Sequence, residues 1–227
     1  MNLKSKIAAL SAVAVLTITF AGHSFAATNA FTDLENVSSK DIIIELQDKG
    51  FVKGVGNDLF APSATLTAAQ GIQLIVNVLD LNLDLIRFFK EPLATDYFKN
   101  ADNDAWYANA LIIASVMSME LPADLDPNQQ WTREEFTHYL VRTMESHNNL
   151  PKIKIVAAQV KDGDEITPDY SGAIQRGLHY GIVQLDADGK FNPKDHLSRA
   201  DAAGEIYKAM KYLEAHVAPV VETKEGL

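Results

Sequence analysis

The chain has 227 residues, of which 47% are hydrophobic, with 20 basic and 30 acidic side chains and no cysteine. The acidic balance argues against nucleic acid or an anionic membrane surface as a partner. The absence of cysteine excludes disulfides, so a hydrophobic core must hold the fold together.

Residues 1–26 are predicted to be an export signal. Lys4 and Lys6 precede the apolar segment 7–20, and Ser24-Phe25-Ala26 places small residues at the −3 and −1 positions of a cleavage site. The apolar segment is shorter than the roughly 20 residues of a membrane span, although a retained anchor is the alternative. Cleavage after Ala26 would leave 18 basic and 30 acidic residues and no membrane span.

The rest of the chain is predicted to form three helix-loop-helix units. In chain order, we expect helices over 39–49, 67–79, 106–116, from 132, from 168 to about 180, and from 198. A hydroxyl residue stands five positions after a proline in each unit: Thr67, Thr132 and Ser198. The predicted division is 31–80, 97–147 and 160–213 for the units, 81–96 and 148–159 for connectors, and 214–227 for a frayed tail.

The apolar pattern after each hydroxyl residue predicts how the units pack. Eight residues beyond it come Ile75, Leu140 and Ile206, and further apolar residues follow at offsets nine and twelve. These spacings put the apolar side chains on one face of each helix. Because one unit alone cannot bury such a face, we expect a mainly α fold in which the three helices pack together. The first connector is also apolar, and we expect it to add one or two helical turns packed on this core.

The order of motifs resembles the surface-layer homology (SLH) domain of bacterial cell-envelope proteins. The third unit carries Gly181-Ile182-Val183, then Asp188-Gly189-Lys190-Phe191-Asn192-Pro193, then Leu197-Ser198-Arg199-Ala200-Asp201. The second has Trp106-Tyr107 and Thr132-Arg133-Glu134-Glu135. The first, which is degenerate, keeps Phe31-Thr32-Asp33 and Phe60-Ala61-Pro62 but has Ala68 where the family has arginine.

This resemblance implies both a shape and a role. The shape is a pseudo-threefold, three-pronged body with the second helix of each unit at its centre. The role is noncovalent attachment to a secondary cell-wall polysaccharide, often one bearing pyruvate ketals, in grooves between prongs. It implies neither a cofactor nor catalysis, and it implies that the groove served by Ala68 binds poorly.

The residues at the helix starts divide into structural and functional candidates. Thr67 with Gln70, Thr132 with Glu135, and Ser198 with Asp201 have the spacing of capping boxes. Capping does not require Arg133 or Arg199, and cations are disfavoured near a helix N-terminus. Beside free backbone N–H groups, each arginine would suit a carboxylate ligand. The alternatives are a solvated arginine or a salt bridge to a neighbouring unit.

Three further residues are candidate glycan contacts. Trp106 is expected either to stack on a sugar or to fill a gap between prongs. Asp33 and Asp162 match the family's opening aspartate, and they would bind sugar hydroxyls or form a turn. Trp131 is expected to pack against Phe136 as a hydrophobic staple.

The sequence gives no support for catalysis or a metal site. It contains no His-Glu-x-x-His or Gly-x-Ser-x-Gly motif. The segment beginning at Asp186 differs from a calcium loop, because its glycine is two positions early and Leu197 stands where the closing glutamate belongs. Together with the predicted export signal, the resemblance leads us to expect an exported, wall-associated or S-layer-associated protein that binds cell-wall polysaccharide. The alternative is a surface module that binds other proteins and has lost glycan recognition.

Overall fold

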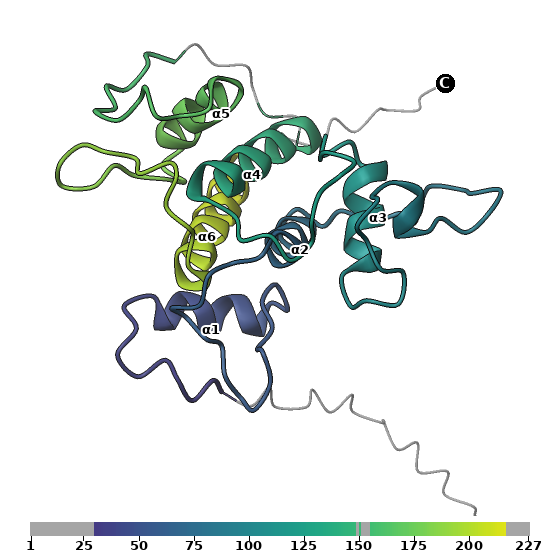
Figure 1. Cartoon of the computed structure of the whole chain (residues 1–227). Helices are drawn as coiled ribbons and strands as arrows, with labels where there is room; N and C mark the ends of the chain where they lie inside the picture. The colour runs from purple at the N-terminus through teal and green to yellow at the C-terminus, as the bar shows by residue number, and fades with distance from the viewer. Residues whose placement is uncertain (1–29, 149, 151–154, 217–227) are drawn as a thin grey trace, which may run out of the picture.

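The computed structural model of the chain describes residues 30–148, 150 and 155–216, so the expected export signal lies outside the described part. The described part is mainly helical and contains no strand, which confirms the fold class. Figure 1 shows the helices: α1 (Lys40–Asp48), α2 (Ala68–Val78), the short 3₁₀ helix η1 (Ala94–Asp96), α3 (Ala108–Val116), α4 (Arg133–His147), α5 (Pro168–His179) and α6 (Arg199–His216).

Local side chains define where the central helices begin. The Thr67 hydroxyl accepts from the backbone N–H of Gln70, whose side chain accepts from the backbone N–H of Thr67. Thr132 and Glu135 form the same reciprocal pair. The third start differs, since the Ser198 hydroxyl accepts from the Asp201 N–H at 3.1 Å and donates to the Asp201 carboxylate at 2.6 Å. All three predicted caps are therefore formed.

Helices α2, α4 and α6 pack against one another in every pair, and the first helix of each unit packs on a different unit. Helix α1 packs on α6, α3 on α2, and α5 on α4, as Figure 1 shows. Ile75, Leu140 and Ile206 are all fully buried, as the repeat predicted. Trp131 is also buried, with its ring centroid 6.4 Å from that of Phe136 and 5.2 Å from that of Tyr139.

A closed ring of backbone hydrogen bonds joins the residues that precede the three caps. The N–H of Leu66 donates to the carbonyl of Leu197 at 2.8 Å, that of Leu197 to Trp131 at 3.1 Å, and that of Trp131 to Leu66 at 3.0 Å. Each unit therefore donates to one neighbour and accepts from the other. Pseudo-threefold symmetry stays a prediction, and this ring is an observation that supports it.

The same loops occupy the first backbone donors of the central helices, so the expectation of free N–H groups beside the arginines is wrong. The N–H of Arg133 donates to the carbonyl of Asp195 at 2.9 Å, and that of Arg199 donates to Ala64 at 2.9 Å. The next N–H of each helix donates to a proline carbonyl, at Pro193 and Pro62 respectively. The helix ends are satisfied by protein and leave no backbone cradle for an anion.

The helical structure in the first connector is limited to η1, a single 3₁₀ turn at its end whose Ala94 is buried. Residues 82–93 are irregular, with a turn at 84–85 and a bend at 89–90. The Asn82 side chain accepts from the backbone N–H of Asp84 at 3.2 Å, a local turn that competes with helix formation, and Pro92 disfavours helix at the residue before it. Leu85 is 98% exposed and Phe89 is fully exposed, so most of this apolar segment does not join the core.

Candidate functional site

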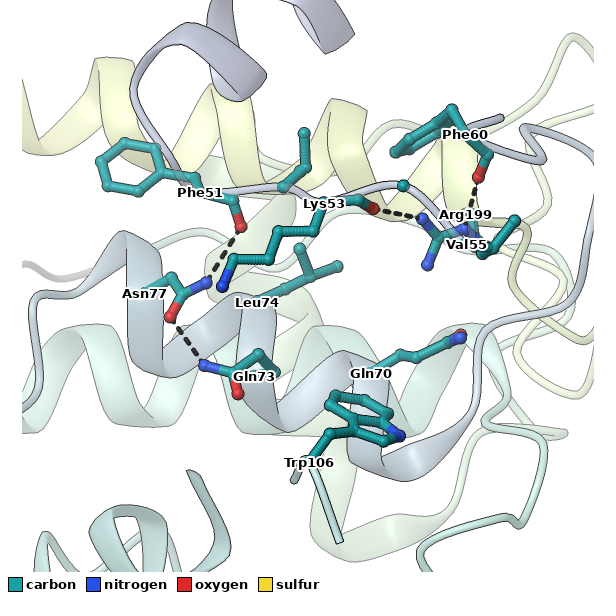
Figure 2. Close-up of a pocket in the computed structure, with 12 residues that line it drawn as sticks. Phe51, Lys53, Val55, Phe60, Gln70, Gln73, Leu74, Asn77, Trp106 and Arg199 are labelled. Carbon is teal, nitrogen blue, oxygen red and sulfur yellow. Dashed lines mark hydrogen bonds between the residues drawn. The ribbon is translucent and has the colours of Figure 1, made fainter. Parts of the chain in front are cut away.

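A cavity of about 520 Å³ lies where parts of all three units meet. The first unit contributes a loop and the outward face of α2, the second contributes Trp106, and the third contributes Arg199 (Figure 2). The lining residues are Phe51, Val52, Lys53, Gly54, Val55, Phe60, Gln70, Gln73, Leu74, Asn77, Trp106 and Arg199. None of them is acidic, although the chain carries a net charge of −10.

Arg199 fastens the first unit's loop at one end of this cavity. Its Nε donates to the carbonyl of Phe60 at 2.8 Å, and its Nη2 donates to the carbonyl of Lys53 at 3.0 Å. The guanidinium carbon lies 4.6 Å from the centre of the Phe60 ring. Figure 2 shows the other terminal nitrogen directed away from both carbonyls, toward the open space near Gln70. Burial lowers the pKa of Arg199, and the charge of Asp33 opposes that effect.

The remaining wall of the cavity combines apolar side chains with three neutral amides, those of Gln70, Gln73 and Asn77. Gln73 donates from its amide to Asn77 at 2.7 Å, and Asn77 donates to the carbonyl of Phe51 at 3.1 Å. The Gln70 oxygen is occupied by the cap of α2, which leaves the Gln70 amide nitrogen facing the cavity (Figure 2). Lys53 is exposed and has no ion-pair partner among the described residues. The cavity therefore combines two cations with amide groups.

Trp106 forms the opposite wall and is 63% exposed. Its ring meets that of Tyr107 edge to face, with 5.5 Å between the centroids. One face of the indole therefore stays open to solvent beside the cavity. An open aromatic face next to hydrogen-bonding amides is an arrangement suited to a sugar ring.

Arg133, from the second unit, contacts the third unit's loop in the same way that Arg199 contacts the first unit's loop. Its Nη2 donates to the carbonyl of Gln184 at 3.0 Å, and its guanidinium carbon lies 5.0 Å from the centre of the Phe191 ring. Gln184 and Phe191 follow Lys53 and Phe60 by the same 131 positions. The two predicted arginines thus belong to separate, similar sites. The structure does not bring them together.

A buried carboxylate distinguishes the Arg133 site. Glu205 is 5% exposed, and its Oε1 lies 3.9 Å from the Nε of Arg133, which is buried without a hydrogen-bond partner in the described structure. Its other oxygen accepts from the Thr137 hydroxyl at 2.9 Å. Burial raises the pKa of Glu205 to about 7, and the charge of Arg133 opposes that increase. When ionised, Glu205 offsets part of the positive charge of Arg133.

Asp33 and Asp162 organise the loops that the arginines hold. The two oxygens of Asp33 accept from the backbone N–H groups of Phe60 and Ala61 at 2.9 and 2.7 Å. Burial alone would raise the pKa of Asp33, but these hydrogen bonds lower it below the ordinary value. Asp162 accepts in the same way from Phe191 and Asn192 at 2.8 and 2.7 Å, and it is 4% exposed. These contacts correspond to the expected turn-forming role, so we do not propose either aspartate as a glycan-binding residue.

Ala68 stands at the position that arginine occupies in the other two units, and its contacts show which loop lacks an arginine. The N–H of Ala68 donates to the carbonyl of Gln129, so the start of α2 faces the loop of the second unit. The first unit's loop receives Arg199 from the third unit. The loop without an arginine is therefore the second unit's, and the groove that Ala68 serves, which we expect to bind poorly, lies beside that loop.

Sequence reasoning missed Lys53, Gln73 and Asn77. Lys53 stands in a short loop where no motif marks it, and Gln73 and Asn77 read as the polar side of an amphipathic helix. Within the described residues, no group of three or more His, Asp or Glu side chains could hold a metal ion. Among the same residues, no helix has the length and apolarity needed to cross a membrane.

Comparison with known proteins identifies relatives for most of the chain. The chain is 28% identical over 180 residues to the exoglucanase XynX of Acetivibrio thermocellus, covering 78% of this chain and 16% of that protein. It is 24% identical over 219 residues to the surface-layer 125 kDa protein of Lysinibacillus sphaericus, covering 93% of this chain and 17% of that protein. The chain is also 28% identical over 200 residues to the amylopullulanase of Thermoanaerobacterium thermosulfurigenes, covering 84% of this chain and 10% of that protein.

The chain spans less than a fifth of the length of these relatives, so their activities do not transfer to it. The S-layer homology domain model matches residues 30–70 and 161–203, which correspond to the first and third predicted units. Both regions have the same loop and opening aspartate in the structure, and each loop is held by an arginine from another unit. The chain therefore carries S-layer homology domains at residues 30–70 and 161–203.

Proposed function

We propose that the protein is exported to the cell envelope and binds an anionic secondary cell-wall polysaccharide without catalysing a reaction. The observation that carries this proposal is the cavity containing Arg199 and Lys53. It presents two cations and no carboxylate in a chain with ten more acidic than basic residues. Such a local reversal of charge favours an anionic ligand. The surface-layer protein among the relatives supports the location.

The lining residues suggest how a charged sugar would bind. The Arg199 nitrogen that faces open space would pair with a carboxylate, such as that of a pyruvate ketal. The Lys53 ammonium, which Figure 2 shows at the other end of the cavity near Asn77, would add a second positive charge for an anionic glycan. The open face of Trp106 would stack on the sugar ring. Gln70 and Gln73 have amide groups that would bond to hydroxyls. The carboxylate oxygens of Asp33 and Asp162 are occupied by backbone N–H groups, so neither residue takes part.

Arg133 offers a second site of the same kind with weaker attraction for anions. Its guanidinium already donates to one carbonyl and lies near the Glu205 carboxylate. A charge 3.9 Å away reduces the net potential that a ligand carboxylate would meet. We therefore place the main binding event at the cavity with Arg199.

Binding to purified wall polysaccharide tests the proposal. We expect Lys53→Gln and Trp106→Ala each to lower affinity about tenfold, since each removes one charge-assisted or stacking contact. Lys99→Gln, an exposed lysine outside the cavity, is the matched control and should bind like the parent. Removing pyruvate ketals from the glycan should weaken the parent, and it should weaken Lys53→Gln by a smaller factor because only Arg199 then remains to pair with the carboxylate. Equal binding by all variants would refute the assigned site.

One observation favours the alternative of a surface module that binds another protein. Both arginines are engaged by loop carbonyls, so their presence has a structural explanation that needs no glycan. Absence of parent binding to wall material with and without ketals would support this alternative.

A further inference from the structure

The loop of residues 82–93 presents an apolar tip that the fold does not use. Figure 1 shows the loop after α2 projecting past α3 at the edge of the molecule. All residues from 84 to 91 are exposed. The large apolar side chains of the loop that stand out are Leu85, Ile86, Phe88, Phe89 and Leu93. None of them lines the cavity with Arg199, so the loop is separate from the proposed glycan site.

The charges on this loop are arranged around the apolar tip. Arg87 lies between Ile86 and Phe88 and Lys90 follows Phe89, while Asp84 precedes Leu85 and Glu91 follows Lys90. Neither Arg87 nor Lys90 has an ion-pair partner in the described part of the chain. Apolar side chains alternating with unpaired cations are typical of segments that lie at a lipid headgroup boundary.

The size of the tip favours a lipid surface over a protein partner. Taking roughly 200 Å² for each fully exposed large side chain, the five residues offer about 600 Å² of apolar surface. A stable protein interface buries about 800 Å² on each partner, drawn from 20 or more residues over a complementary face. A single protruding loop offers less area and no such face. A bilayer needs no complementary shape, because it deforms around the inserted side chains.

We propose that residues 84–91 insert into the headgroup region of an anionic lipid bilayer and hold the domain at a membrane surface. Leu85 and Phe89 would enter the boundary with the acyl chains, and Arg87 and Lys90 would pair with lipid phosphates. The rest of the chain is acidic, so contact would be confined to this loop. This role is independent of glycan binding.

Flotation with vesicles tests the proposal, using the protein without residues 1–26, which precede every described helix. The probes are phosphatidylcholine vesicles with and without about one third phosphatidylglycerol. We expect the parent to float with anionic vesicles, and Leu85→Ser with Phe89→Ser to lower its partitioning at least about tenfold. Arg87→Gln with Lys90→Gln should lower binding about 20-fold on anionic vesicles and little on neutral ones.

Two further measurements separate the possible outcomes. All four substituted residues are exposed, so the variants should melt at the parent's temperature and bind wall glycan as the parent does. A Phe89→Trp variant should show blue-shifted emission relative to the parent only when anionic vesicles are added. No flotation of the parent, or equal flotation of the Ser variant, would overturn the proposal. Concentration-dependent self-association that the Ser variant abolishes would instead assign the loop to a second copy.

Discussion

Substitution of Gly71 by alanine tests the packing at the centre of the fold. Gly71 lies on α2 beneath the indole of Trp131. An added Cβ would lie 2.5 Å from the Cε3 of Trp131 and 3.2 Å from the Cδ2 of Phe136. The Trp131 ring is buried and stacked on Tyr139, so it has little room to move away. Relieving the clash must therefore shift core side chains or the α2 backbone.

Two opposing effects set the expected magnitude. Overpacking a well-filled core costs up to about 3 kcal/mol. Replacing glycine by alanine inside a helix returns about 1 kcal/mol. We therefore expect Gly71→Ala to lower the free energy of unfolding by about 2 kcal/mol. In a domain of this size, that corresponds to a fall of roughly 4 to 8 °C in Tm.

Gly204 on α6 provides a matched control. A Cβ at Gly204 would meet no heavy atom within 4 Å, so only the helix preference remains. Gly204→Ala should raise the free energy of unfolding by about 0.5 to 1 kcal/mol. Urea unfolding at neutral pH, followed by tryptophan fluorescence, measures both changes. If Gly71→Ala is stabilising to the same extent as Gly204→Ala, the inferred contact between α2 and Trp131 is wrong.

Three other substitutions test the buried charges and the loop anchors. Glu205 has an ordinary pKa of 4.5, raised to about 7 by burial, so its contribution to stability is lost as pH rises through this window. Between pH 4.5 and pH 8, the free energy of unfolding of Glu205→Gln should rise by about 3 kcal/mol relative to that of the parent. Burial and then Arg142 and Arg176 lower the pKa of His138 from 6.5 to about 4, so its contribution is lost as pH falls through that range. As pH falls from 7 to 4, the free energy of unfolding of His138→Phe should therefore rise by about 3 kcal/mol relative to that of the parent. For either variant, a difference from the parent that does not change with pH would contradict the assignment. Asp162→Asn cannot accept from both backbone donors and should cost about 2 kcal/mol in urea unfolding, whereas the exposed Asp188→Asn should cost little.

The predictable parts of the fold are those determined by interactions between residues close in sequence within one unit. Thr67 and Thr132 fix helix starts through side chains three residues away, so the spacing alone indicated them. The residue eight positions after each cap is fully buried because helical periodicity places it on the inner face. Both inferences depend on short separations along the chain, which sequence shows directly.

The connector shows where apolar composition was insufficient. The large apolar residues of the connector suggested helical turns against the core: Leu83, Leu85, Ile86, Phe88 and Phe89. The turn at Asn82 and the proline at Pro92 disfavour helix at both ends of the segment, and residues 84–91 are exposed. Composition alone does not separate a buried segment from an exposed apolar loop, since the distinction depends on what the rest of the chain leaves uncovered.

The candidate site could not be assembled from sequence because each loop receives its arginine from a different unit. Arg199 holds the first unit's loop, Arg133 holds the third unit's, and Ala68 faces the second unit's. The assignment follows from the order in which the helices close around the centre, with α1 returning to pack on α6. The repeat register identifies equivalent residues, but it contains no information on which copies meet. The first unit, although it lacks the arginine itself, thus contributes the loop of the cavity that Arg199 and Lys53 line, and the effect of Ala68 falls on the second unit's loop.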